Sequence, residues 1–162
     1  MKNKIYILKI ILILLFFINT NSFSNDQFNF NVTELEITEN GNKVKGFKRG
    51  TITTDDGIKF DADEFDYDKL LNIFNARGNI DIIDKVQNFE IYSEKATYLK
   101  NDHKIFTEGK SKVIDKNNNI IIEADNLNYH KLLNIFNASG NVKVLDKNRD
   151  IILYTDNATY LK

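Results

Sequence analysis

The chain has 162 residues, of which 42% are hydrophobic and 12% aromatic, so it holds enough apolar material for the core of one domain. Its 22 basic and 23 acidic residues are interspersed, which argues against electrostatic binding of nucleic acid. The absence of cysteine excludes disulfides, thiolate metal sites and a lipidated cysteine, so stability must come from backbone ladders and apolar burial.

The first 24 residues have the composition of a signal peptide. Three lysines lead into an apolar run over residues 10–18, and a small-x-small pattern follows at 22–24. The run is shorter than the roughly 20 residues that span a bilayer, so an uncleaved membrane anchor is the weaker alternative. We therefore expect residues 1–24 to be removed. Residues 25–162 then form the mature domain, whose 19 basic and 23 acidic residues give a net charge of −4.

An internal repeat organises the mature chain. Residues 62–100 and 124–162 align without a gap and share 21 of 39 positions. A shorter step of 31 residues underlies this repeat and predicts a stack of equivalent units. The columns that recur at this step are Tyr67, Tyr98, Tyr129 and Tyr160; Lys69, Lys100, Lys131 and Lys162; Gly78, Gly109 and Gly140; Asp84, Asp115 and Asp146; and the acidic Asp63, Glu94, Asp125 and Asp156.

Apolar residues follow the same register with the period of a strand. Within each unit three positions alternate as i, i+2 and i+4, the pattern of a strand with one face turned inward. The columns are Ile58, Phe89, Ile120 and Ile151; Phe60, Ile91, Ile122 and Leu153; and the small Ala62, Ser93, Ala124 and Thr155. The partner segments continue the alternation at Ile80, Ile82, Val113, Val142 and Val144. The many β-branched and aromatic residues favour strands over helix, the alternative for the leucine-dense segment 67–75.

Polar stretches predict chain reversals about every 15 or 16 residues, at 84–88, 115–119 and 146–150 and after each repeated tyrosine. A straight strand of that length exceeds the usual range. We therefore expect a kink near the middle of each segment between reversals. In one segment of each unit the kink lies at the repeated glycine, and in the other it lies at the acidic column, which we expect to face solvent. The predicted fold is all-β: an antiparallel meander of bent strands that forms two sheets facing each other across an apolar interior.

This pattern resembles the OstA-like domain of lipopolysaccharide-transport proteins. Three elements carry the resemblance, each present twice: Ala-Asp-x-x-x-Tyr from 62 and 124, Asn-Ala-x-Gly-Asn from 75 and 137, and Ala-Thr-Tyr from 96 and 158. The pattern covers residues 28–162 and looks most like the N-terminal periplasmic part of the outer-membrane assembly protein LptD, with the stand-alone periplasmic bridge LptA as the alternative. The resemblance implies a twisted β-jellyroll open along one edge. Its groove carries the acyl chains of lipopolysaccharide across the periplasm, and such domains join end to end through their terminal strands.

The resemblance implies a periplasmic, non-enzymatic protein of outer-membrane assembly. Its expected partners are lipopolysaccharide, other OstA-like domains and further copies of itself, with no cofactor, metal or nucleic acid. The apolar columns alone are also compatible with a closed core. The candidate lipid-groove residues are Ile58, Phe60, Ile80, Ile82, Phe89, Ile91, Val113, Ile120, Ile122, Val142, Val144, Ile151 and Leu153.

Two other classes of protein stay open at this point. A structural or adhesive exported repeat protein with a solid core shares every periodicity and binds no lipid. An enzyme needs catalytic groups that break the repeat at one place, whereas the acids here recur with it. His103 and His130 occupy different columns and are expected in solvated turns, and the repeated tyrosines at the core edge with their hydroxyls in water.

Overall fold

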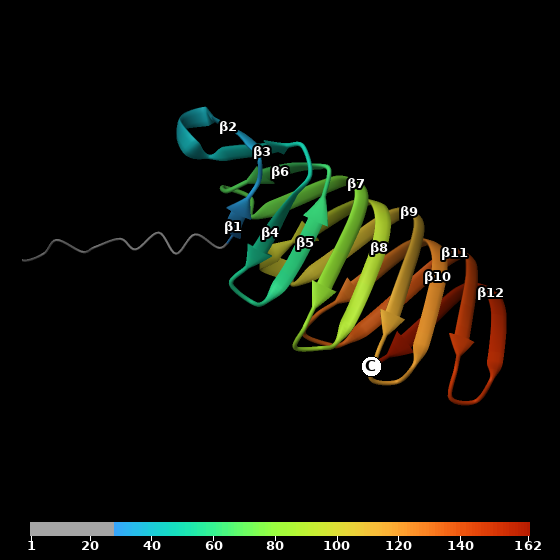
Figure 1. The fold of residues 1–162 in the computed structure, drawn as a ribbon. Helices are drawn as coiled ribbons and strands as arrows, with labels where there is room; N and C mark the ends of the chain where they lie inside the picture. Colours follow the sequence, from blue (N-terminus) through green and yellow to red (C-terminus); the bar gives the residue numbers. More distant parts are fainter. Residues whose placement is uncertain (1–27) are drawn as a thin grey trace, which may run out of the picture.

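The computed structural model describes residues 28–162 (Figure 1). The predicted leader and its cleavage point lie outside the described residues. Within residues 28–162, no helix is long and apolar enough to cross a membrane. The elements are β1 (Phe28–Asn31), β2 (Glu34–Thr38), η1 (Glu39–Gly41), β3 (Lys43–Phe47), β4 (Gly50–Thr54), β5 (Ile58–Ala62), β6 (Glu64–Asp68), β7 (Ile73–Asp84), β8 (Phe89–Leu99), η2 (Lys100–Asp102), β9 (Lys104–Asp115), β10 (Ile120–His130), β11 (Ile135–Asp146) and β12 (Ile151–Leu161).

The strands form one antiparallel sheet rather than the two that the pattern predicted. Its order is β1-β4-β5-β7-β8-β9-β10-β11-β12, and β2, β3 and β6 join it through β7. The pairs β1 and β2, β3 and β4, and β5 and β6 are halves of interrupted passes, so the chain crosses the fold nine times. The predicted meander, with reversals every 15 or 16 residues, is confirmed.

Bends in the middle of the passes fold this sheet into two walls. Wall A comprises β1, β4, β5 and the halves of the long strands beside the hairpins β7–β8, β9–β10 and β11–β12. Wall B comprises β2, β3, β6 and the remaining halves. The strand register shifts at the bends, as between Arg77 and Ile80 of β7. The predicted kinks are confirmed at Gly78, Gly109 and Gly140, whose φ angles of 74°, 81° and 75° lie in the left-handed region that glycine adopts without steric cost.

The hairpin turns are built by asparagine and aspartate. Asparagine tolerates positive φ better than most residues, and aspartate closes a turn by accepting backbone N–H groups. Asp84 Oδ1 accepts from Gln87 N at 2.9 Å, and Asp146 Oδ1 accepts from Asn148 N at 2.9 Å. These polar residues therefore form the predicted reversals. The turn asparagines with φ near 55° are Asn72, Asn88, Asn119 and Asn134.

Aromatic contacts show that the inner faces of the two walls pack against each other. The ring centroids of Phe60 in wall A and Phe74 in wall B are 4.9 Å apart, and those of Phe89 in wall A and Phe136 in wall B are 5.2 Å apart. The first pass and β12 remain the two edges of the sheet, which is not closed by backbone pairing. The hydrophobic core of the described fold therefore lies between the walls.

Candidate functional site: the interior between the walls

All thirteen predicted groove residues lie on the inner face of wall A. Strand pairing sets them side by side, as where Ile91 lies opposite Val113, and Val113 opposite Ile122. Because neighbouring strands lie about 4.8 Å apart, the columns merge into continuous apolar rows along the stack. Nine of the thirteen are at most 2% exposed: Ile58, Phe60, Ile80, Ile82, Phe89, Ile91, Val113, Ile122 and Val142.

The interior opens toward β12. Ile120 and Val144 are only partly buried and pack against the core. Ile151 and Leu153, the corresponding residues of β12, are each 52% exposed. The apolar rows therefore reach solvent at the C-terminal end of the described fold, where the other side of β12 is unpaired.

Wall B supplies a second inner face that the sequence reasoning did not assign to the groove. It is more aromatic than wall A and carries small residues nearer the bend. The same period-2 alternation, at Phe74 and Ala76 or at Ala96 and Tyr98, was a signal that could have identified it. Its buried residues are Val44, Phe65, Tyr67, Phe74, Ala76, Ala96, Tyr98, Ile105, Thr107, Leu127, Tyr129, Phe136 and Ala138.

Buried hydroxyl groups interrupt the apolar interior near the bend. Ser93 Oγ lies 3.1 Å from Ser111 Oγ, and Thr107 Oγ1 donates to Ser111 Oγ at 2.7 Å. Ser93 Oγ also donates to the Glu108 carbonyl oxygen at 3.0 Å. These polar groups satisfy one another, so they add little to the cost of an apolar interior.

Charged side chains bridge the walls along the edge opposite the bends. We call three of these contacts the rim latches: Lys100 with Asp56, Lys131 with Asp84, and Lys162 with Asp115. Their nitrogen–oxygen distances are 3.3, 3.5 and 2.6 Å. Each lysine follows a strand of wall B, and each aspartate lies at a hairpin of wall A. The rim latches therefore hold the tips of the two walls together.

Two carboxylates of the rim latches, Asp56 and Asp115, are held in their charged form. Burial raises the pKa of Asp115, but hydrogen bonds from Lys162, Tyr160 and Asn118 outweigh burial and lower it below its usual value. Burial likewise raises the pKa of Asp56, and hydrogen bonds from Thr54 and Tyr98 with the charges of Lys131 and Lys100 lower it well below the usual range. Asp56 and Asp115 are therefore ionised at neutral pH.

The repeated tyrosines donate hydrogen bonds to protein side chains, so the expectation that their hydroxyls lie in water is wrong. Tyr98 Oη donates to Asp56 Oδ2 at 2.7 Å, and Tyr160 Oη donates to Asp115 Oδ2 at 2.6 Å. Burial and the bond to Asp115 raise the pKa of Tyr160 to about 12. The tyrosine column thus extends the aromatic lining of wall B, with Tyr98 and Tyr160 bonded to rim carboxylates and the other two bonded to turn asparagines.

The two histidines lie on neighbouring segments of the backbone, because His130 is opposite Lys104 and Lys131 N donates to the His103 carbonyl oxygen at 2.9 Å. His103 follows η2 with φ 52°, and its Nδ1 lies 3.9 Å from Asp56 Oδ2. His130 is the last residue of β10, so its predicted place in a turn is wrong. Within residues 28–162, no group of three or more histidine, cysteine or acidic side chains could hold a metal ion.

Comparison with known proteins identifies the fold. No protein-family model matches the chain, and no curated protein matches its sequence. Among solved structures, it is similar to LptH of Pseudomonas aeruginosa, described as the LptA-homologous periplasmic component of the conserved lipopolysaccharide transport device. The TM-score is 0.63 at 14% sequence identity, over 79% of this chain and 93% of LptH. The chain therefore has the LptA-like twisted β-jellyroll fold that the sequence resemblance implied.

Proposed function

We propose that this protein is a periplasmic carrier that binds the acyl chains of lipopolysaccharide between its two walls, as part of transport toward the outer membrane. The observation that carries the proposal is the pair of apolar inner faces, which run the length of the stack and open at Leu153. Each acyl methylene moved from water into such an interior contributes about 0.8 kcal/mol. The fold shared with a component of a lipopolysaccharide transport device supports the same role.

In this proposal lipid takes the place of contacts that now fill the interior. The wall tips are joined by the rim latches rather than by backbone pairing, so the walls separate there without loss of ladder hydrogen bonds. Water then solvates the separated aspartates, and the anionic head group pairs with the separated lysines. The thirteen residues of wall A, with the aromatic face of wall B, are the proposed acyl-chain contacts.

We place the protein in a chain of OstA-like domains joined end to end. The sequence resemblance favours the N-terminal domain of an LptD-like protein over a stand-alone LptA-like bridge. Whether the reading frame continues past Lys162 distinguishes the two.

Photo-crosslinking at adjacent residues of one strand tests lipid binding. Ile122 faces the interior and is 1% exposed, whereas Ile121 is on the opposite face of β10. We expect a photo-reactive residue at position 122 to capture lipopolysaccharide in cells, and the same residue at 121 or at Asp125 not to. Equal capture at all three positions, or at none, would contradict the proposal.

The dense aromatic packing between the walls favours a second candidate, an exported structural repeat protein with a solid core. Phe89, Tyr129 and Phe136 contact one another at centroid distances of 4.3 to 5.2 Å. Such a core is complete without a ligand. Absence of lipid capture at position 122, in a protein that remains folded, would favour this function.

A further inference from the structure

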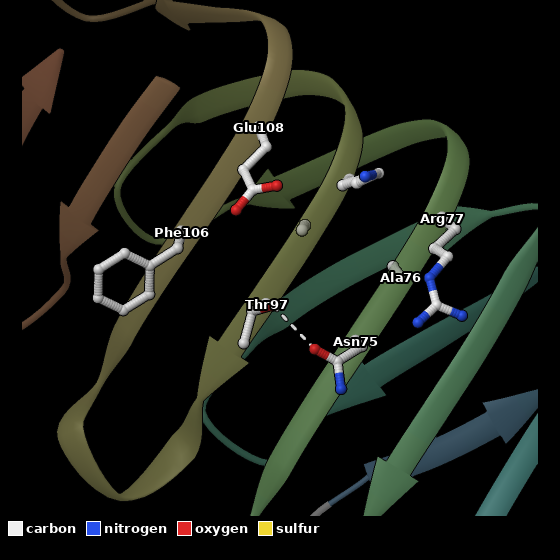
Figure 2. A pocket seen from close by; sticks show the side chains of 8 residues that line it. Asn75, Ala76, Arg77, Thr97, Phe106 and Glu108 are labelled. Carbon is white, nitrogen blue, oxygen red and sulfur yellow. Dashed lines mark hydrogen bonds between the residues drawn. The ribbon is translucent and has the colours of Figure 1, made fainter. Parts of the chain in front are cut away.

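The outer face of wall B carries two shallow hollows separated by Phe106. One lies over β7, β8 and β9 and is bordered by Asn75, Arg77, Phe106 and Glu108. Figure 2 shows Phe106 and Glu108 on one strand, Thr97 on the next and Asn75 on the third. The other hollow lies over β9 to β12, and its outward side chains are Phe106, Glu108, Asn126, Asn128, Asn137, Ser139, Asn157 and Thr159. Both lie on the opposite side of the sheet from the apolar interior.

Phe106 breaks the 31-residue repeat on this face. The units on either side have asparagine at the equivalent positions, Asn75 and Asn137. Each accepts a hydrogen bond from a threonine on the neighbouring strand. Thr97 Oγ1 donates to Asn75 Oδ1 at 2.8 Å (Figure 2), and Thr159 Oγ1 donates to Asn137 Oδ1 at 2.9 Å. The middle unit has lost this threonine–asparagine rung.

In the middle unit Asn128 lies opposite Phe106. It stands where the neighbouring units have Thr97 and Thr159. Its Oδ1 atom is buried and has no hydrogen-bond partner among the described residues. A buried polar atom without a partner costs stability, and a bound ligand can supply the missing donor. Both changes from the repeat therefore place unpaired groups on this face at the expense of a structural hydrogen bond.

The hollow over β9 to β12 is also nearly uncharged. At the 62-residue step, Glu64, Arg77 and Lys95 of the first repeat correspond to neutral residues in the second. The charges of the first repeat face opposite charges across strands, with Glu64 opposite Arg77 and Lys95 opposite Glu108 of β9. Glu108 is the one ionisable residue that borders the second hollow. The neutral replacements are Asn126, Ser139 and Asn157.

We propose that this face binds an uncharged stretch of oligosaccharide. An asparagine amide offers both donors and an acceptor, which suits the paired hydroxyls of a sugar. The electron-rich face of Phe106 can pack against the C–H groups of a pyranose ring. Asn126, Asn128 and Asn157 border the hollow, and within residues 28–162 their side chains form no hydrogen bond that would compete with a ligand. The row from β9 to β12 spans about 14 Å, enough for a short chain lying across the strands.

Restoring the repeat tests the proposal without harming the fold. The double variant Phe106→Asn with Asn128→Thr places on β9 and β10 the rung that the neighbouring units already contain. It should unfold at the same or a higher temperature than the parent protein. If these residues bind sugar, the variant should bind at least about fivefold more weakly, because it lacks the ring and the Asn128 amide, and its new asparagine at position 106 accepts a hydrogen bond from the new threonine. If these residues had only a structural role, the variant would not keep its unfolding temperature and at the same time lose affinity for sugar.

The measurement is an amide NMR titration of the mature chain with maltohexaose, cellohexaose and deacylated lipopolysaccharide core oligosaccharide. Saturable shifts at Phe106, Asn126 and Asn128 with any of these probes, weakened in the double variant, support the proposal. Lys143→Asn on the outer face of wall A is the control and should bind like the parent protein. No shifts with all three probes, or shifts that the double variant leaves unchanged, would overturn it. Binding of the free sugars indicates general glycan binding, whereas binding of the deacylated core alone indicates recognition of a glycolipid. Neither result depends on lipid capture at Ile122.

Discussion

The buried ion pair of Lys162 and Asp115 shows how the repeated charges act at the level of single residues. Asp115 is fully buried, and the Lys162 side chain is 5% exposed. The two residues are 47 positions apart in the chain. The columns of lysine and aspartate are visible in the sequence, but their pairing is not, because it joins strands three passes apart and depends on how far each pass bends. Asp146, the third aspartate of its column, contacts Arg149 of its own turn instead.

Removing one partner of this pair should destabilise the protein at neutral pH. Lys162→Met leaves the Asp115 carboxylate buried with only neutral donors, and breaking a buried pair in this way costs roughly 3 kcal/mol. Lys112→Met is the matched control, because Lys112 is 40% exposed and pairs with Glu123 at 3.5 Å on the outer face. Exposed pairs contribute less than about 1 kcal/mol. Urea unfolding at pH 7 measures both free energies.

The same pair should make the cost of Lys162→Met depend on pH. The pKa of Asp115 is lowered in the folded state, so its contribution is complete above the unfolded value of about 3.9 and is lost as the pH falls through the lower folded value. In the variant the carboxyl is protonated more readily. The difference between the two proteins should therefore shrink below pH 4. If the difference in unfolding free energy between the two proteins stays constant from pH 7 to pH 3, protonation of Asp115 is not coupled to folding.

At the scale of single elements, the bends place a glycine opposite an acidic side chain. A Cβ atom on Gly140 would lie 2.5 Å from Asp125 Oδ2, and one on Gly78 would lie 2.6 Å from Asp63 Oδ2. Asn141 Nδ2 donates to the same Asp125 oxygen at 2.8 Å. The acidic column therefore lies at the bends, as predicted, and there it also orders the glycine-asparagine segment.

Gly140→Ala should cost roughly 2 to 3 kcal/mol, because the alanine meets both an unfavourable φ of 75° and the Asp125 carboxylate. Gly109→Ala should cost less, since its nearest neighbour, Glu94 Cβ, would be 3.4 Å away. Thermal unfolding of both variants checks this order. Adding Asp125→Ala to Gly140→Ala should recover part of the loss. If all three variants lose equal stability, the contact with the acidic side chain has no part in the effect.

The extent to which sequence predicts these elements follows from the range of the interactions. The 31-residue step and the period-2 alternation depend on local residues, and they predict strand lengths, kinks and the inner face of wall A. The second inner face was missed because the apolar alternation on wall B is diluted by alanines such as Ala76 and Ala96. Whether an inner face is exposed, as at Leu153, depends on how many neighbouring strands cover it, which a pattern within one strand does not encode.

For the whole molecule, the number of passes determines how two copies can meet. Nine passes is an odd number, so the first pass and β12 both run from wall A to wall B. β12 has exposed apolar residues on both faces, including Ile152 and Leu153 at 52% each, and one edge without a strand partner in the described fold. Such an edge is a template for another strand. If walls and interior continue from one domain into the next, β12 must pair with the first pass of its neighbour in parallel.

Cysteine crosslinking tests this prediction cleanly, because the native sequence contains no cysteine. Parallel docking places the wall A half of β12 beside β1 of the next copy, whereas antiparallel docking places it beside β2. We therefore expect Leu153→Cys, mixed at high concentration with Phe30→Cys, to form a disulfide-linked heterodimer. The same protein mixed with Ile37→Cys should form little, since Ile37 lies on β2. Preferential crosslinking to position 37 would show antiparallel docking, and a chain that stays monomeric by light scattering and crosslinks to neither position would rule out end-to-end assembly of this protein with itself.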